Sequence, residues 1–400
     1  MFGISRSKRS RHDGIGQGSS AAPGVQHAPS ELPVRNETRH DRGRNVYFQK
    51  GQFLARQDRW DMLGRLIAET DRTKGATPAG DSLAALLAVG ARDDAVRHAR
   101  GAIQGKECPV PAGIDALTEL TQDMPNTYAI FLVAARAQID CAWAYEGQVD
   151  PYAMPRVASE AFLDRFDVAS ELLAQAEALA PESVEVAATK CDLLAAVPGA
   201  EDLVDALHRD VIRADPGNPG RLRSYGVHLL PRWFGSYSHL ARMSETLSQE
   251  AQPIWGNQAY AWMWFDALRL DPEAAEELDV DRFLAGLDEI LASSENAHLA
   301  NLISAYVDGM KPAAAPDDLS AGAMAVRQHI HAALPALTGR HLTELHPQVW
   351  ARADALPGAS HAGPLSAGRI AAATAQARSA VEAALSIRLH PAPAGMGRSA

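Results

Sequence analysis

Residues 169–183, ASELLAQAEALAPES, combine small and apolar side chains at helical spacing and then reach a proline. Ala169, Leu173 and Ala176 recur at intervals of four and three residues, so they lie on one face of a helix. Pro181 ends the pattern because proline lacks the N–H of a helix interior and its ring clashes with the preceding turn. We therefore expect a helix that packs this Ala/Leu face closely against a neighbour.

A second segment with the same layout follows. Leu203, Leu207 and Val211 occupy the equivalent positions, and the segment ends in RADPGN. Pro216 comes 35 residues after Pro181. A spacing of about 34 residues is typical of tetratricopeptide repeats, in which the second helix precedes a proline. Both segments resemble that second helix, although the W-x2-L-G-x2-Y pattern of the first helix is not matched in either copy.

This resemblance implies an all-α fold, in which antiparallel helix pairs stack into a right-handed α-solenoid. It covers about 70 residues directly, and the short connections elsewhere extend the same helix-pair arrangement along the chain. The alternative is a set of generic packed helices that end in Ala or Leu before a proline. A solenoid has a concave face, and the resemblance implies that this face binds a protein or a peptide.

Helical periodicity continues on both sides of these segments. Residues 47–70 place Phe48, Phe53 and Trp60 near helical spacing, with a break expected around Asp58. Further helices are expected at 81–104, 112–123, 127–147, 157–180, 183–196, 200–214, 219–229, 236–251, 256–270, 279–293, 295–309, 318–335 and 366–388.

The ends of the chain have a different composition. Residues 1–45 and 391–400 are rich in polar residues, Gly and Pro and lack apolar periodicity, so we expect both to be disordered. The predicted organisation is a disordered basic tail (1–45), a tetratricopeptide-like domain (46–310), C-terminal helices (311–390) and a second disordered tail (391–400).

Composition predicts an acidic, well-packed body. The 400 residues are 46% hydrophobic and 22% charged, enough for a sizeable core. The net charge is −11, but residues 1–45 contribute +4, so the rest of the chain carries −15. Nucleic-acid binding requires a basic face, and we therefore expect no nucleic acid as the main partner.

Cysteine usage and hydropathy predict a soluble, cytoplasmic protein. Cys108, Cys141 and Cys191 lie far apart without C-x-x-C spacing, which fits a reducing compartment. No signal-peptide core is recognisable at the N-terminus, and no run of 18 apolar residues spans a membrane. Arg accounts for 32 of the 38 basic residues, a bias typical of GC-rich bacterial genomes.

The most unusual local chemistry lies at residues 229–237, LLPRWFGSY. Pro231 ends the preceding helix, Gly235 allows a backbone conformation closed to other residues, and Ser236 is placed to cap the next helix. Together with the WGNQAYAWMW that follows, this Pro-Arg-Trp-x-Gly-Ser string resembles a family of uncharacterised bacterial helical proteins. That resemblance implies a helical fold and no particular activity.

Aromatic and arginine side chains near this turn form the candidate binding groove. The helix at 256–270 carries aromatic residues on several faces, which favours burial. Trp262, however, shares a sector with polar residues, so it is the better candidate for exposure on this helix. Trp, Tyr and Arg contribute most to binding at interfaces. The predicted groove residues are Arg232, Trp233, Tyr237, Gln258, Trp262 and Arg269. The alternative is that these side chains only lock adjacent helix pairs together.

Recognisable catalytic and metal-binding patterns are missing. No phosphate-binding loop, dinucleotide fingerprint or G-x-S-x-G occurs. His329, His331, His341 and His346 cluster in one stretch, but their spacing does not resemble H-E-x-x-H. We therefore predict no catalytic residues, no metal and no cofactor.

Two functions remain in competition. The first is a helical-repeat scaffold or adaptor that binds a protein or peptide in its concave face. The second is an α/α-type hydrolase that uses acidic residues in a central pocket. A deep pocket lined by mutually close acids favours the enzyme, and a shallow aromatic groove favours the binder. A weaker third hypothesis is that the basic tail docks on nucleic acid or anionic lipid. Neither the partner nor the oligomeric state follows from the sequence.

Overall fold

The structure is a computed structural model that describes residues 32–105, 112–146, 159–293, 296–353 and 365–389. These residues form an all-α fold, as the sequence predicts. No strand forms among them, and extended backbone pairs only at two isolated bridges, Val34 with Leu345 and Ala76 with Ser82.

Helices account for most of the described chain. In its first half they are α1 (Arg39–Arg56), α2 (Trp60–Arg72), α3 (Leu83–Gln104), α4 (Ala112–Asp123), α5 (Tyr128–Tyr145), α6 (Glu160–Leu179), α7 (Val184–Leu193), α8 (Val204–Ala214) and α9 (Pro219–His228). In its second half they are α10 (Tyr237–Glu250), α11 (Gln252–Trp255), α12 (Gln258–Phe265), α13 (Ala267–Leu270), α14 (Val280–Ala292), α15 (Ala297–Asp308), α16 (Ala321–Ala332), α17 (Leu334–His341), α18 (Pro347–Ala351) and α19 (Ala367–Leu389). Short 3-10 helices lie at Leu194–Ala196, Ala200–Asp202, Pro272–Glu277 and Pro312–Ala314.

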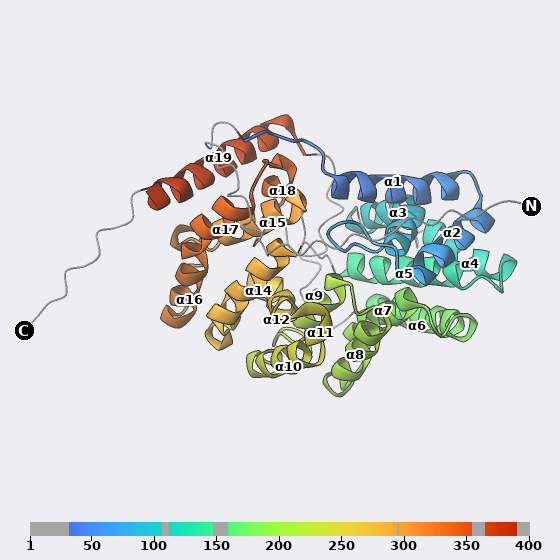
Figure 1. Cartoon of the computed structure of the whole chain (residues 1–400). Helices are drawn as coiled ribbons and strands as arrows, with labels where there is room; N and C mark the ends of the chain where they lie inside the picture. Colours follow the sequence, from blue (N-terminus) through green and yellow to red (C-terminus); the bar gives the residue numbers. More distant parts are fainter. Residues whose placement is uncertain (1–31, 106–111, 147–158, 294–295, 354–364, 390–400) are drawn as a thin grey trace, which may run out of the picture.

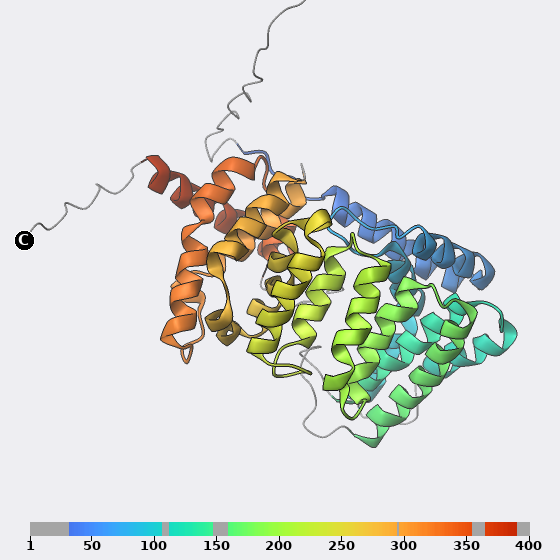
Figure 2. The same ribbon diagram turned by 60° about the horizontal axis from the view of Figure 1, so that its bottom comes forward.

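The helices pack mainly against their neighbours in sequence. α5 packs on α6, α6 on α7, α7 on α8 and α8 on α9, and α12 then contacts α9, α10 and α14. Figure 2 shows this succession as a curved row of helices. α1, α3 and α5 stack in layers at one end of the molecule, and α15 to α19 form the other end (Figure 1).

Two large apolar cores lie along this row. The first is built mainly from α1 to α7, between Leu54 and Val186. The second is built mainly from the helices after α7 and reaches Ala384 in α19. Helices α16 to α19, which the sequence analysis separates from residues 46–310, therefore share a core with α9 to α15.

Helix α12 lies at the centre of the second core because it is apolar on every face. Its residues 259–265 are all buried. A Cβ on Gly226 of α9 would lie 1.8 Å from the carbonyl oxygen of Met263. A Cβ on Gly286 of α14 would lie 2.5 Å from the carbonyl oxygen of Asn257. Only glycine allows such approaches, so these two positions let α9 and α14 cover α12.

Local signals define helix ends where the sequence predicts them. Ser236 Oγ accepts a hydrogen bond from the backbone N–H of His239 at 3.1 Å, which caps α10 as expected. Asp58 has a φ of 52° between α1 and α2, which confirms the expected break. The helix predicted at 256–270 is interrupted at Asp266, between α12 and α13.

The prediction of a disordered tail through residue 45 is wrong over residues 32–45. Leu32 is buried in the second core, and α1 begins behind a capping box in which Thr38 and Asp41 exchange hydrogen bonds. The N–H of Arg35 donates to the carbonyl oxygen of Leu345 at 2.8 Å. These contacts fasten the start of the described chain to its C-terminal half. The rest of that tail, and the tail predicted at 391–400, lie outside the described residues.

Candidate functional site

The turn at residues 231–237 joins two parts of the helix row. Phe234 is buried, and Trp233 packs its ring against Trp143 of α5 and His228 of α9, with centroid distances of 6.2 and 5.2 Å. Gly235 does not have a positive φ, so it does not use the backbone freedom that the sequence suggested for it. It is required because a Cβ there would lie 2.4 Å from a backbone carbonyl oxygen. The turn therefore fastens the end of α9 to α5.

The other predicted groove residues differ in exposure. Trp262 is 1% exposed, so the prediction that it faces a groove is wrong, because α9, α10 and α14 cover α12. Arg269 donates a hydrogen bond to the backbone after α18, whereas Arg232 is exposed at the turn. Gln258 and Tyr237 are partly buried at the starts of α12 and α10. A binding role for the exposed members stays a prediction.

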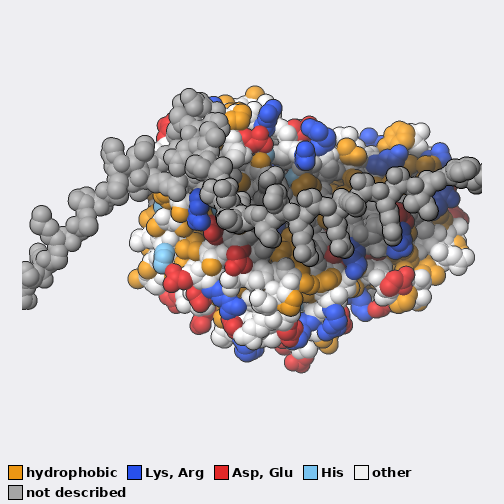
Figure 3. Space-filling model, viewed as in Figure 1, with side chains coloured by type: hydrophobic (Ala, Val, Ile, Leu, Met, Phe, Trp, Pro, Cys, Tyr) orange, Lys and Arg blue, Asp and Glu red, His pale blue; other side chains and the backbone are white. Residues whose placement is uncertain are grey.

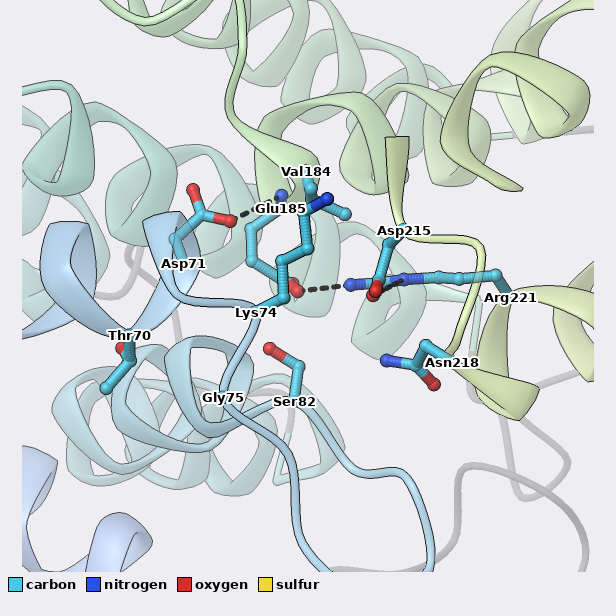
Figure 4. Close-up of a pocket in the computed structure, with 10 residues that line it drawn as sticks. All are labelled: Thr70, Asp71, Lys74, Gly75, Ser82, Val184, Glu185, Asp215, Asn218 and Arg221. Atoms are coloured by element: carbon cyan, nitrogen blue, oxygen red, sulfur yellow. Dashed lines mark hydrogen bonds and ion pairs between the residues drawn. The ribbon is translucent and has the colours of Figure 1, made fainter. Parts of the chain in front are cut away.

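Acidic side chains do meet in a small pocket between α2, α7 and the start of α9 (Figure 4). Arg221 donates to Glu185 at 2.5 Å and to Asp215 at 3.4 Å. Asp71 accepts a hydrogen bond from the backbone N–H of Glu185 at 3.2 Å. The enclosed volume is about 10 Å³, which is room for one water molecule. This pocket therefore does not supply the substrate cavity that the hydrolase hypothesis requires.

The charged groups of this pocket connect neighbouring helices. Burial raises the pKa of Asp71, and hydrogen bonds from Ser183 and Tyr128 offset part of that effect. Burial also acts to raise the pKa of Glu185. The positive charges of Arg221 and Arg136 outweigh this effect and hold the pKa below its usual value. The ionised Glu185 thus pairs with Arg221 across the interior and connects α7 to α9. Removal of Arg221 would leave the buried charge of Glu185 without this ion pair.

A larger cleft lies beside the C-terminal helix α19. Its volume is about 450 Å³, and the end of α15, the junction of α16 with α17, and α19 enclose it. Its apolar lining residues are Ala332, Leu334, Pro335, Ala380, Ala383 and Ala384. Alanine side chains on α19 are too short to fill the space beside Leu334 and Pro335, so the cleft stays open. Its size and lining are typical of sites that bind a small molecule or a partner's side chain.

Polar groups form another part of the cleft. Asp308 at the end of α15 is 5% exposed and accepts hydrogen bonds from Lys311 and Gln376, both at 3.1 Å. Nδ1 of His331 lies 3.1 Å from the carbonyl oxygen of Val307, so it donates to one of the last carbonyl groups of α15. A few polar groups within an apolar cleft give a ligand one preferred orientation.

The C-terminal histidines are spread over separate contacts. His329, His341 and His346 each face a different carboxylate. Their partners are Asp281 at 3.7 Å, Asp288 at 3.1 Å and Glu344 at 2.9 Å, respectively. Within the described ranges, no group of three or more His, Cys, Asp or Glu side chains is arranged to hold a metal ion.

The sequence predicts the helix that borders the cleft but gives it no role. A helix is expected at 366–388, and α19 occupies nearly that range. Hydrophobic periodicity does not distinguish an alanine face that packs from one that borders an open space. The available signal was weak: Gln376 and Ser379 interrupt an alanine-rich stretch on the side that lines the cleft.

Neither surface charge nor similarity identifies a ligand. Acidic and basic side chains are interspersed over the described residues visible in Figure 3, which show no extended basic surface for nucleic acid. No described helix is long and apolar enough to cross a membrane. The chain matches no family model, no curated protein and no solved structure.

Proposed function

We propose that this protein is a helical scaffold or adaptor that binds a protein or peptide partner, and that the cleft beside α19 is its binding site. The observation that carries the proposal is a cleft of about 450 Å³ with apolar walls and a few polar groups. Interfaces derive much of their affinity from a few anchor side chains that fill well-packed pockets.

The chemistry of the cleft favours an apolar anchor. Burial of a Leu, Ile or Phe side chain contributes about 1.5–3 kcal/mol. The ion pair between Asp308 and Lys311 at 3.1 Å balances the charge at the rim. Gln376 and Ser379 are exposed on α19 and offer hydrogen bonds to a peptide backbone. A charged anchor would lose its hydration without gaining a free counter-charge.

We also propose that the helix row is a right-handed, tetratricopeptide-like solenoid. The support is that α5 to α9 pack in sequence order. In α6, Ala169, Leu173 and Ala176 are all buried, as expected for the second helix of a repeat. In the second copy Val211 is buried but Leu203 is exposed, so this copy fits the repeat less well.

Filling the cleft tests the proposed binding site. Ala383 is exposed and lines the cleft, so Ala383→Trp places a large side chain in the space while the buried face of α19 is unchanged. Full-length wild-type and variant proteins would capture partners from host-cell extract, with quantification by mass spectrometry. We expect a partner of the wild type to bind the variant roughly tenfold more weakly, since one anchor contributes about 1.4 kcal/mol or more.

Ala371→Trp is the matched control, because Ala371 is exposed on the same helix and does not line the cleft. This control should capture the same partner as the wild type, and both variants should keep the wild-type melting temperature. Undiminished capture by Ala383→Trp would exclude the cleft as the binding site. Loss of the partner in both variants would show that α19 itself was disturbed.

A further inference from the structure

The carboxylate of Asp308 lines the cleft that α15, α16, α17 and α19 enclose (Figure 1), and only one of its two oxygens is engaged. Oδ2 accepts hydrogen bonds from Nζ of Lys311 and Nε2 of Gln376, each at 3.1 Å. Oδ1 accepts none from the described residues, and it is not one of the polar atoms that the fold buries without a partner. Since the side chain is only 7% exposed and lines the cleft, Oδ1 meets solvent in the cleft.

His331 brings a second open acceptor to the same cleft. Its Nδ1 lies 3.1 Å from the carbonyl oxygen of Val307, and a carbonyl oxygen only accepts, so Nδ1 carries the proton. In the neutral ring Nε2 is then an acceptor, on the side of the imidazole away from Val307. Nε2 makes no hydrogen bond with the described residues and is accessible to solvent. Val307 directly precedes Asp308, so both open acceptors lie at the end of α15.

The charge of this wall favours a neutral donor over a cation. Lys311 already balances the charge of Asp308 at 3.1 Å, so a cationic ligand would lose hydration and meet the charge of Lys311. A neutral hydroxyl or N–H group leaves that ion pair intact and donates to Oδ1 of Asp308 or to Nε2 of His331. Hydrogen bonds to an ionised acceptor are about twice as strong as those between neutral groups.

The volume of the cleft favours an aromatic ring over a small aliphatic group. A dry cavity of about 150 Å³ holds benzene, and this cleft has about 450 Å³. A leucine-sized group would therefore leave apolar space unfilled and would forfeit dispersion contacts with the lining. A ring can lie against Leu334, Pro335 and the alanine methyl groups of α19, which form the apolar part of the cleft.

We propose that the cleft binds a phenol ring, and that the anchor of the partner is a tyrosine side chain. The ring packs on the apolar lining, and its hydroxyl donates to one of the two open acceptors, Oδ1 of Asp308 or Nε2 of His331. Tyrosine has the required combination of a large apolar body and a polar tip, and it is enriched among the residues that dominate interfaces. This inference rests on the function proposed for the cleft and names the side chain that the cleft takes.

Three small aromatic probes test this recognition on the full-length protein at about pH 8, where histidine side chains are mostly neutral. p-Cresol corresponds to the tyrosine side chain and toluene to that of phenylalanine, and 4-methylanisole keeps the oxygen of p-cresol without its donor. We expect p-cresol to bind saturably and roughly tenfold more tightly than the other two, a ratio that one hydrogen bond can supply. Ligand-detected NMR titrations measure the three affinities.

Two substitutions test the acceptors. In Asp308→Asn the amide oxygen accepts from Lys311 and Gln376, so an NH2 donor takes the place of Oδ1, and His331→Phe keeps a ring but removes Nε2. We expect at least one of them to bind p-cresol no more tightly than 4-methylanisole. His329→Phe is the control, because exposed His329 lies on the same helix without lining the cleft, and it should keep the wild-type preference.

The comparison of probes on the wild type keeps the test valid if either substitution lowers folding stability. The proposal is overturned if p-cresol shows no saturable binding in the millimolar range, if toluene or 4-methylanisole binds as tightly, or if both variants keep the preference for p-cresol. It is also overturned if Ala383→Trp, which fills the cleft, binds p-cresol as the wild type does. Equal affinities of the three probes would remove the tyrosine anchor alone, whereas undiminished partner capture by Ala383→Trp would remove the proposed function.

Discussion

Gly51 of α1 and Gly90 of α3 bring two helix backbones into direct contact at one crossing. A Cβ on Gly51 would lie 2.1 Å from the carbonyl oxygen of Leu87, and a Cβ on Gly90 would lie 2.0 Å from that of Phe48. Both distances are far shorter than a van der Waals contact. The atoms approached belong to the helix backbone, which cannot move aside on its own. Glycine on both helices therefore determines how α1 packs on the first core.

Gly90→Ala should lower the free energy of unfolding. Alanine is the better helix former by about 1 kcal/mol, but the clash with the α1 backbone outweighs this gain, and overpacking typically costs about 1–3 kcal/mol. Denaturant unfolding measures the difference. Gly101→Ala in the same helix is the control, because no atom lies within 4 Å of a Cβ there, and it should raise stability. A Gly90→Ala protein more stable than the wild type would contradict the direct backbone contact between α1 and α3.

Trp262→Ala should destabilise the protein by about 3–5 kcal/mol, because truncation of a fully buried aromatic side chain leaves a cavity. Thermal and denaturant unfolding of the variant measure this loss. Phe53→Ala provides the contrast, since Phe53 is 57% exposed and should change stability by less than about 0.5 kcal/mol. If Trp262→Ala is as stable as the wild type, the Trp262 side chain is exposed and not part of the core.

Acid should destabilise the protein through the buried pair His208 and His228, whose Nε2 and Nδ1 atoms lie 2.8 Å apart. Burial lowers the pKa of His228 to about 4 and that of His208 well below its usual value. Histidines of the unfolded chain titrate near about 6.5, so below that pH the unfolded state binds protons that the folded state does not. Stability is therefore lost progressively as the pH falls from about 6.5 toward 4.

The free energy of unfolding, measured between about pH 7.5 and 4.5, tests this contribution. Burial also lowers the pKa values of His40 and His298, which add to the wild-type slope and are the same in the variants. His228→Gln should be less stable at neutral pH and should lose less stability on acidification, because one depressed pKa is removed. His329→Gln, at a largely exposed histidine, should keep the wild-type slope. A wild-type slope in His228→Gln would show that other groups cause the acid sensitivity.

Leu32→Ala should cost about 2–3 kcal/mol of stability, because Leu32 is 6% exposed within the second core. Val34→Ala, two residues away, is the control, since Val34 is 38% exposed and should have a small effect. Urea unfolding compares the two variants. Equal and negligible effects would mean that the segment before α1 does not contribute to the core.

The sequence predicted helices well and contacts poorly. Asp58 and Ser236 mark a break and a cap that the structure confirms, because both act on backbone groups a few residues away. Trp262 was misplaced because polar neighbours in its own helix do not reveal that three other helices cover it. Nothing in the sequence indicated that Ala383 lines a cleft, since an alanine beside a cleft and one in a close helix contact have the same sequence pattern.

By itself, the sequence determined that this chain is helical and where most of its helices end, because periodicity, prolines and caps act over short distances. The tertiary structure alone decided which apolar faces are buried, where a cleft remains open and which charges meet. Arg35 hydrogen-bonds Glu344 across 309 residues of chain, and no local pattern encodes such a contact. Burial and charge pairing depend on which segments the fold brings together, and this determines where the chain can bind a ligand.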